Sequence, residues 1–353
     1  MEFIFSEDQL LLQRTVREFL EGECTAEHVR SLWGSPTGRS PGFWAKFAEI
    51  GVPGLLVPEV HGGLGMDEID FVLLLEEAGR AALPEPVIET ALVGASLIAA
   101  SGDPALCERW LPAVASGEAI LAVGHAVSPF VSDAHIAALL LMQHGDEVHR
   151  VDPKDAQLTQ QPCNDPSRRL FSVAWAPTDA TCLARGGEGR ALWSAALDRG
   201  ALGCAAEQLG VADRLIEMAV DYACQRKQFG VAIGSFQAIK HMLANRKVQL
   251  EYARSVVYRA AHSISRSAPS RSVDVSSAKV AASAAAVAAA KTALQVHGAI
   301  GYTWEQDLHV WMRRAWSLDL AWGDNAWHRA RVADAVIDGA LPAETFGYSA
   351  PGA

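Results

Sequence analysis

The chain has 353 residues, half of them hydrophobic, and a formal net charge of −11 at pH 7. This length is enough for two or three domains with sizeable cores. The acidic balance argues against nucleic acid as a partner, because phosphate binding needs a basic surface. No apolar run is long enough to span a bilayer, and no basic segment precedes an apolar one at the N-terminus. We therefore expect neither a membrane span nor a signal peptide.

Six cysteines are spread along the chain, and none forms a CxxC pair or a cysteine–histidine cluster. This usage predicts no metal site and a reducing, cytoplasmic location. The chain also lacks the glycine-rich phosphate loops and the His-Glu-x-x-His motif that mark known nucleotide and zinc sites. The glycine run at 186–189 does not have their spacing, so we interpret it as a linker.

Residues 1–118 have the pattern of a helical domain. Ser6 and Gln9 make a capping box ahead of helically spaced apolar residues, and Asp67 is placed to cap a later helix. Two more helices are expected at about 89–101 and 104–116.

Residues 119–186 change character, because helical periodicity fades and short apolar runs appear between Gly, Asp and Pro residues. This pattern predicts a small, mostly antiparallel β domain. Residues 187–353 return to helix, with a serine- and arginine-rich loop expected at 265–277. The four helices of a bundle are expected at 194–224, 236–263, 278–294 and 326–340. The sequence thus predicts a mainly α fold with an N-terminal helical domain, a small middle β domain and a C-terminal four-helix bundle.

The stretch 226–241, RKQFGVAIGSFQAIKH, joins two of the predicted bundle helices through a short turn. An arginine at a helix C-terminus is favoured by the helix dipole alone. The Arg226 guanidinium can also form a forked contact with a diphosphate, and Gln228 and Gln237 offer amide partners. Both interpretations fit the residues.

A second stretch, QVHGAIGYT at 295–303, ends the alanine-rich helix of the bundle. Gly298 and Gly301 permit positive φ, and their lack of a side chain lets a ligand approach the backbone closely. A plain helix stop at Gly298 is the simpler interpretation of the same residues.

Together, these two stretches resemble the FAD-binding segments of the acyl-CoA dehydrogenase family. In that family an Arg-x-Gln-Phe-Gly turn and a Gln-x-x-Gly-x-x-Gly-Tyr segment contact the ADP half of an FAD bound in a neighbouring subunit. The resemblance covers nearly the whole chain, from Phe5 to Arg329, and includes the glycine loop at 62–65. It implies FAD as cofactor, with these binding residues: Arg226, Gln228, Phe229, Gln237, Gln295, Gly298, Gly301 and Asn325.

The resemblance also implies a reaction, the α,β-dehydrogenation of an acyl-CoA thioester, as in the β-oxidation of fatty acids or sterol side chains. A carboxylate base removes the α-proton, the β-hydride goes to the flavin, and hydrogen bonds stabilise the enolate-like charge. The implied partners are the acyl-CoA substrate and an electron acceptor of the electron-transfer flavoprotein type. A homologous second subunit, or a second copy of the chain, completes the assembly.

The sequence departs from the family pattern where the base is expected. The usual Glu position, after an aromatic residue, is Gly323, and the position used by a minor branch is Gly200. Neither glycine can take a proton. Asp324 is displaced from the first position by one residue, so it is a candidate base; it is also well placed to cap the final helix. Asp198 is displaced from the second position.

A second departure affects the flavin ring. The family has a Thr-Glu-Pro-type segment at the start of the β domain, where this chain has Gly124–Pro129. Ser128 is a candidate stand-in for the missing threonine. Asn325 and His328 either face the flavin or substrate, or are a polar cap and a surface histidine.

Three hypotheses follow. In the first, the chain is one subunit of a hetero-oligomeric dehydrogenase whose partner supplies the catalytic Glu. In the second, it is a self-sufficient flavoenzyme with Asp324 as base. In the third, it is a helical scaffold that has lost flavin and serves only as an interface.

Overall fold

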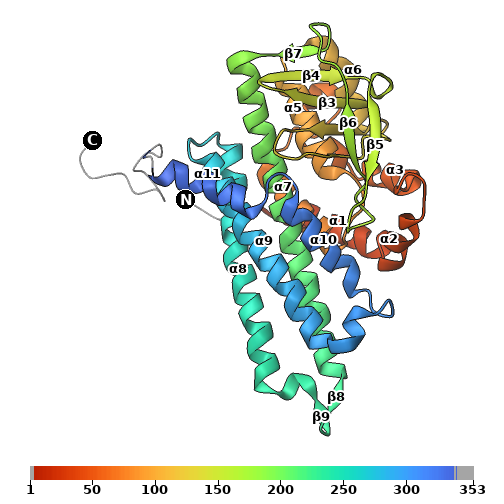
Figure 1. Cartoon of the computed structure of the whole chain (residues 1–353), viewed down its shortest axis with the longest axis vertical. Coiled ribbons are helices and arrows are strands. Elements are labelled where there is room, and N and C mark those ends of the chain that lie inside the picture. The colour runs from red at the N-terminus through yellow and green to blue at the C-terminus, as the bar shows by residue number, and fades with distance from the viewer. Residues whose placement is uncertain (1–3, 338, 340–353) are drawn as a thin grey trace.

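The structure is a computed structural model that describes residues 4–337 and 339 (Figure 1). The fold is mainly α, as predicted, and its three regions follow one another along the chain. Short N-terminal helices pack beside the strands, and long C-terminal helices extend away from both (Figure 1).

The N-terminal region consists of short helices with local capping signals. Ser6 and Gln9 form the predicted capping box, and Asp67 forms a second one with Asp70. A π-helical stretch, η3, runs directly into α5 and places Glu89 inside the protein. The elements are α1 (Glu7–Glu23), α2 (Ala26–Trp33), α3 (Pro41–Glu49), η1 (Val52–Gly54), η2 (Glu59–His61), α4 (Glu68–Arg80), η3 (Ile88–Gly94), α5 (Ala95–Ala100) and α6 (Pro104–Ala115).

Two small sheets form the β region. One has the strand order β1-β3-β4-β7 and the other β2-β6-β5. Only the β1–β3 pair within these two sheets is parallel, so the predicted mostly antiparallel pairing is confirmed. The elements are β1 (Leu121–Gly124), β2 (Val131–Ser132), β3 (Leu139–His144), β4 (Glu147–Val151), η4 (Pro153–Asp155), β5 (Gln157–Gln161), β6 (Leu170–Ala174) and β7 (Cys182–Ala184).

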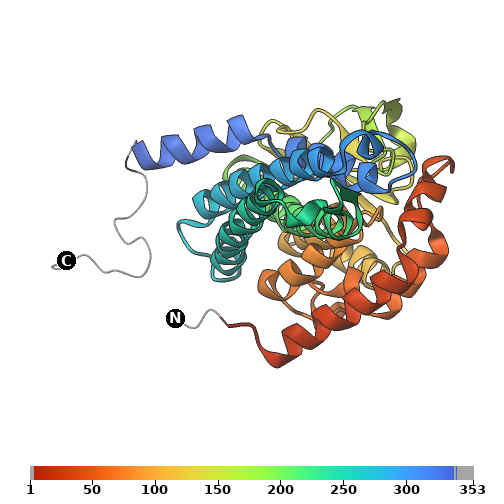
Figure 2. The same cartoon turned by 90° about the horizontal axis from the view of Figure 1, so that it is seen from below.

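Long helices dominate the C-terminal region. The elements are α7 (Gly186–Gln225), β8 (Lys227–Gln228), β9 (Val231–Ala232), η5 (Ile233–Ser235), α8 (Gln237–Ser265), α9 (Arg271–His297), η6 (Gly298–Tyr302), α10 (Leu308–Leu320) and α11 (Asn325–Ile337). The four-helix bundle consists of α7, α8, α9 and α10. The helix predicted at 326–340 is α11; it packs along α9 and then projects from the body (Figure 2). Residues 338 and 340 of that prediction lie outside the described residues.

Two local predictions were wrong for reasons of packing. The run 186–189 is not a linker but the first turn of α7, where a side chain on Gly189 would overlap the carbonyl oxygen of Asp146. Glycine is therefore needed for the helix to pack against the turn between β3 and β4. The predicted loop at 265–277 is much shorter, because α9 already begins at Arg271.

The helical domain and the bundle meet at two reciprocal glycine contacts. Gly79 of α4 lies against the carbonyl oxygen of Glu207 in α7, and Gly210 of α7 lies against the carbonyl oxygen of Glu76 in α4. Any Cβ at either glycine would overlap backbone atoms of the other helix. These glycines therefore fix a backbone-to-backbone approach between the two regions.

The stretch Arg271–Tyr302 has the length and composition of a membrane span, with a mean hydropathy of 1.3, although no span was expected. However, 56% of its most apolar window is buried inside the protein. Its helix, α9, packs against α7, α8, α10 and α11. Since the core helix of a bundle has the same composition as a span, we interpret α9 as the central helix of the bundle.

Candidate functional site: two regions at different levels of helix α7

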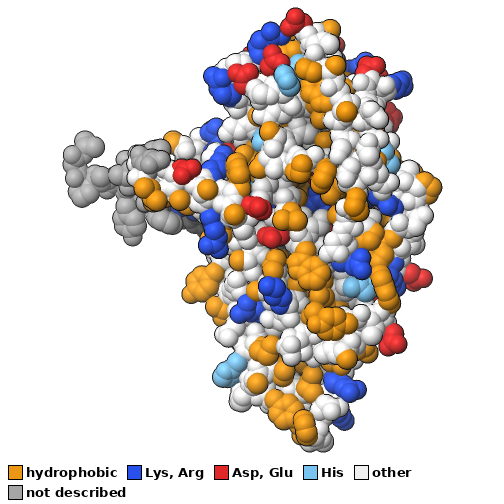
Figure 3. All heavy atoms as spheres, in the orientation of Figure 1, with side chains coloured by type: hydrophobic (Ala, Val, Ile, Leu, Met, Phe, Trp, Pro, Cys, Tyr) orange, Lys and Arg blue, Asp and Glu red, His pale blue; other side chains and the backbone are white. Residues whose placement is uncertain are grey.

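The first region is the turn after α7. The strands β8 and β9 form a hairpin whose central residues, Phe229 and Gly230, have φ of 54° and 82°. Positive φ at both positions is typical of a two-residue type I′ turn, but an aromatic residue there is unusual. Phe229 is 92% exposed, and Figure 3 shows hydrophobic side chains at this lower tip of the molecule.

The second half of the sequence signature lies at the same end of the bundle. His297, the last residue of α9, stacks on Tyr222 near the end of α7, with ring centroids 4.4 Å apart. Gly298 follows with φ of 66°, and no atom lies within 4 Å of the space that a Cβ would take. The structure therefore brings the two predicted segments together and leaves the Gly298 backbone open to a ligand.

Several predicted nucleotide-binding side chains in this region are exposed. Arg226, Gln228, Gln237 and Gln295 all face solvent. Among the residues that the structure describes, no carboxylate pairs with the Arg226 guanidinium. Gln228 Nε2 donates only to the carbonyl oxygen of Lys227. This donor set, rich in N–H groups and open to solvent, fits the diphosphate of a dinucleotide.

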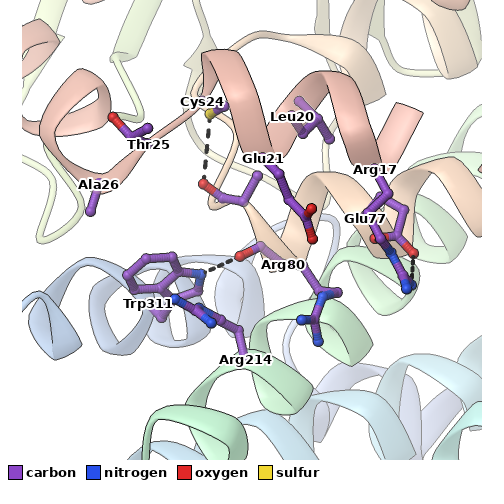
Figure 4. A pocket seen from close by; sticks show the side chains of 11 residues that line it. Arg17, Leu20, Glu21, Cys24, Thr25, Ala26, Glu77, Arg80, Arg214 and Trp311 are labelled. Carbon is purple, nitrogen blue, oxygen red and sulfur yellow. Dashed lines mark hydrogen bonds and ion pairs between the residues drawn. The ribbon is translucent and has the colours of Figure 1, made fainter. Parts of the chain in front are cut away.

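Three arginines around another cavity are paired within the protein. A cavity of about 350 Å³ between α1, α4, α7 and α10 is lined by Arg17, Arg80 and Arg214 (Figure 4). All three arginines form ion pairs with carboxylates of the protein. We therefore interpret these charges as structural and not as a ligand site. The pairs are Arg17–Glu77, Arg80–Asp213, Arg80–Glu217 and Arg214–Glu217, at 2.6–2.9 Å.

The second region is a cavity of about 600 Å³ between the β region and the α10–α11 turn. Its volume and mixed lining are those of a small-molecule site. Three tryptophans line it: Trp316, Trp322 and Trp327. Its charged lining includes Arg168, whose Nη2 donates to Glu89 Oε1 at 3.3 Å and to Ser132 Oγ at 3.0 Å. Of these residues, sequence reasoning singled out only Trp322, as the aromatic residue before Gly323; no local motif marks the others.

Trp322 covers the position on α7 that the sequence analysis considered for a base. Its indole lies directly on Gly200 of α7, so that a Cβ at Gly200 would overlap the six-membered ring. Trp322 is only 5% exposed and has φ of 55°. The α7 position that carries the Glu in a minor branch of the family is therefore filled by an indole in this chain.

The other base position is constrained by its backbone. Gly323 has φ of 95°, a conformation that side-chain-bearing residues rarely adopt. A Cβ there would lie 2.8 Å from Nε2 of His328. His328 is not a surface histidine but is buried, with Nδ1 3.0 Å from Ser276 Oγ and Nε2 2.9 Å from the Trp322 carbonyl oxygen. Burial lowers the pKa of His328 to about 4, so it is neutral at pH 7.

The turn between α10 and α11 is also held by a buried lysine of α9. Lys279 of α9 is fully buried and donates from Nζ to the carbonyl oxygens of Leu318 and Asp319, at 2.9 and 3.0 Å. These contacts satisfy the C-terminal carbonyl groups of α10. Burial lowers the pKa of Lys279. The conformation that places Trp322 over Gly200 is thus held in place by α9.

The two aspartates close to the expected base positions have structural partners. Asp324 Oδ1 accepts from the backbone N–H of Trp327 at 2.8 Å, which is an N-cap contact for α11, although Asp324 also lines the cavity. Asp198 is buried and accepts from Arg331 at 2.9 Å and Ser272 at 2.7 Å. Asn325 donates to Asp319 at 3.2 Å and is not on the cavity wall.

The segment at the start of the β region contributes a histidine and a serine to the cavity. His125 Nδ1 accepts from the Val127 N–H at 3.0 Å, which places the ring proton on Nε2. Burial lowers the pKa of His125 to about 4. Ser128 also lines the cavity, as its candidate role requires. The segment therefore offers neutral hydrogen-bonding groups at the cavity wall.

A group of buried charges lies beside the cavity. Arg314 donates to Asp165 at 2.6 Å and approaches Glu207 at 4.0 Å. Burial raises the pKa of Glu207 and of Glu85 to about 7, and nearby arginines only partly oppose this effect. The structure therefore places two carboxyl groups, those of Glu207 and Glu85, beside the cavity with pKa values raised to about 7.

The two regions lie too far apart to share one dinucleotide within a single chain. Arg226 follows Gly200 by about seven turns of α7, which is roughly 39 Å at about 1.5 Å per residue. That separation exceeds the length of an extended dinucleotide. A cofactor whose flavin ring lies in this cavity therefore does not reach Arg226 of the same chain.

Comparisons with known proteins agree with this architecture. Family models of the acyl-CoA dehydrogenase N-terminal domain and C-terminal domain match residues 6–118 and 187–337. Acyl-CoA dehydrogenase IpdE2 of Mycolicibacterium smegmatis is 35% identical over 312 residues, which cover 88% of this chain and 93% of the relative.

Solved structures show the same fold at lower identity. Butyryl-CoA dehydrogenase from Megasphaera elsdenii aligns with a TM-score of 0.86 and 21% identity, covering 96% of this chain and all of that one. A chain of the ChsE4–ChsE5 complex from Mycobacterium tuberculosis aligns with a TM-score of 0.84 and 24% identity, covering 97% and 100%. The matched domains and the IpdE2 relative establish that the chain belongs to the acyl-CoA dehydrogenase family, FAD-dependent oxidoreductases acting on CH–CH bonds.

Proposed function

We propose that this chain is one subunit of a hetero-oligomeric acyl-CoA dehydrogenase, whose homologous partner supplies the catalytic Glu. The observation that carries this proposal is the closure of both base positions. An indole lies on Gly200, and Gly323 has a backbone conformation that excludes most side chains. In this proposal the chain keeps the family fold, and neither of these two positions supplies the carboxylate that removes the α-proton.

In this proposal the exposed end of the bundle acts on a cofactor held mainly by the partner. Arg226 binds the diphosphate of FAD, while Gln228, Gln237 and Gln295 donate hydrogen bonds and Phe229 packs against the nucleotide. Gly298 allows close approach of the backbone, whereas Gly301, contrary to the sequence-based expectation, is buried against His297 and Leu294 of its own chain. The support is geometric, since these groups lie at one end of the bundle and Arg226 has no carboxylate partner among the described residues.

FAD, held by these residues, would supply the acceptor for the hydride of the acyl-CoA β-carbon. The residues of this chain orient the cofactor and exclude water, and the partner's carboxylate holds the proton taken from the α-carbon. We further propose that electrons leave to an acceptor of the electron-transfer flavoprotein type. A reducing cytoplasmic location is also part of the proposal, and it is supported by six cysteines that are all unpaired.

The ChsE4–ChsE5 complex supports the assembly proposed here. The name of that complex gives two different chains, and one chain of the complex shares the fold of this protein over nearly the full length. A two-chain assembly also fits the separation of Gly200 and Arg226 along α7, since a second chain can bring its own Arg226 turn to the cofactor.

The test compares the chain alone with the chain co-expressed with candidate homologous partners, using acyl-CoA turnover and the flavin absorbance spectrum. We expect no turnover by the lone chain and turnover by a complex, lost when the partner's base is replaced by Gln. Robust turnover by the lone chain would contradict the proposal. A protein that takes up no FAD with any partner would instead identify a helical scaffold.

The self-sufficient enzyme is kept as a second candidate, because Asp324 lines the cavity. Replacing Asp324 by Asn separates the two proposals, since Asn also caps helices well. We expect the Asp324→Asn complex to retain turnover. Loss of turnover with an unchanged flavin spectrum would assign the base to Asp324.

A further inference from the structure

A histidine–glutamate–histidine cluster lies at the end of the β3–β4 hairpin. His144 ends β3 and is paired in register with Glu147, the first residue of β4. His149 follows Glu147 by two positions, so the two side chains share one face of the strand. Nδ1 of His144, an oxygen of Glu147 and Nε2 of His149 all lie within 4.8 Å of one another.

The spacing of these atoms is close to that of metal ligands. His149 Nε2 lies 3.0 Å from Glu147 Oε2, and His144 Nδ1 lies 3.5 Å from the same oxygen. Ligand bonds of about 2.0–2.1 Å in a tetrahedral zinc site separate neighbouring ligand atoms by about 3.3 Å. Two of the three separations are thus close to those of such a site, and all three ligand atoms lie within 4.8 Å of one another. The fourth corner faces solvent, because the His144 side chain is exposed.

The buried histidine is oriented by a further contact. His149 Nδ1 lies 2.9 Å from Thr181 Oγ1, and the Thr181 hydroxyl has the Thr178 carbonyl oxygen as acceptor at 2.9 Å. With that bond made, the Thr181 oxygen accepts the Nδ1–H of His149. On a neutral ring the lone pair of Nε2 then faces the carboxylate, an arrangement that a cation between the two atoms stabilises. A hydrogen bond of this kind at the second ring nitrogen is typical of metal-bound histidine.

We propose that His144, Glu147 and His149 form a zinc site with an open fourth position. Two neutral imidazoles and one carboxylate are ligands that suit Zn²⁺. Arg185 approaches only the other carboxylate oxygen, with Nε 3.9 Å from Oε1, which leaves Oε2 to the metal. Since Thr181 precedes β7, zinc would tie the hairpin to that strand. The site is independent of the proposed dehydrogenase function.

The test uses the full chain, alone or with its partner, after treatment with a chelator. Calorimetric titration with Zn²⁺ is expected to show one equivalent per chain and binding that weakens as pH falls, since zinc competes with protons. Glu147→Gln and His144→Ala should abolish this binding. Thr181→Val should weaken it roughly 10- to 100-fold. His61→Ala, which removes a histidine far from the hairpin in sequence, is the matched control and should bind as the wild type does.

Titration with Co²⁺ identifies the ligand atoms. We expect visible bands of nitrogen and oxygen ligation and no thiolate charge-transfer band. A thiolate band would assign the metal to a cysteine and overturn the proposal. Absence of zinc binding, or unchanged binding in both Glu147→Gln and His144→Ala, would overturn it as well. Both positions lie at the partly exposed end of the hairpin, so the test does not depend on replacing the buried His149.

Discussion

The turn after α7 and the cavity near the start of α7 treat their functional groups in opposite ways. At the turn, Arg226 and the neighbouring carboxamides are exposed, and Phe229 projects into solvent at positive φ. At the cavity, Trp322 fills the space over Gly200, and Asp198 has partners in α9 and α11. The chain thus keeps the turn open to a ligand and closes the position over Gly200, as expected of the proposed subunit that helps to bind the cofactor and leaves the base to its partner.

The largest expected effect comes from forcing a carboxylate into the closed region. Gly200→Glu would place its Cβ inside the indole of Trp322, so we expect a loss of about 3–5 kcal/mol in unfolding free energy. Urea denaturation measures it. The double variant Gly200→Glu, Trp322→Ala, compared with Trp322→Ala alone, is the control. Equal costs of the glutamate in both backgrounds would show that the indole does not close this position.

Substitutions in the open region, the turn after α7, should weaken cofactor binding and leave the unfolding free energy nearly unchanged. Arg226→Ala in the assembled enzyme is expected to weaken FAD binding roughly 10- to 100-fold, because one charge-assisted contact to phosphate is lost. Urea unfolding of the chain should change by less than about 0.5 kcal/mol. Arg190→Ala, which removes an exposed arginine paired with Asp146, is the matched control. Unchanged FAD affinity would remove Arg226 from the site.

A third prediction concerns pH and the buried charges beside the cavity. The pKa of Glu207 is about 7 in the folded protein and has its ordinary lower value when unfolded, so the folded state binds this proton more tightly. This contribution is present below about pH 4.5 and is lost as pH rises to 7. Glu207→Gln should raise unfolding free energy by about 1–2 kcal/mol at pH 8 and hardly at pH 4.5. Calorimetry at both pH values measures this, with exposed Glu49→Gln as control.

The smallest effect is expected at the cap of α11. Asp324→Ala removes the acceptor for the Trp327 N–H and should cost about 1 kcal/mol in unfolding free energy, whereas Asp324→Asn should cost much less. Thermal melts of the two variants measure the difference. Equal stability of both variants would show that Asp324 does not act as a cap. Its side chain would then be available to a ligand in the cavity.

Features set by neighbouring residues could be predicted from the sequence. The Ser6–Gln9 capping box, the alanine-rich helix and the two glycine segments depend on local backbone preferences and spacing. The two segments were expected to act together, and the Tyr222–His297 stack places them at one end of the bundle. Their roles toward FAD stay predictions.

Features set by long-range packing could not be predicted. Gly189 looked like part of a linker because its contact with Asp146 comes from a distant hairpin. His328 looked exposed because its partners, Ser276 and the Trp322 carbonyl, are not visible in a local pattern. The His144–His149 cluster shows the same limit, since only the strand register brings those side chains onto one face.

The reciprocal contacts of Gly79 and Gly210 have a consequence for recognition. Because backbone atoms of α4 and α7 touch directly at these glycines, the angle between the helical domain and the bundle has little freedom. A second subunit that touches both regions meets a surface already in its final shape. Less configurational entropy is then lost when the complex forms, and more of the contact energy remains as affinity.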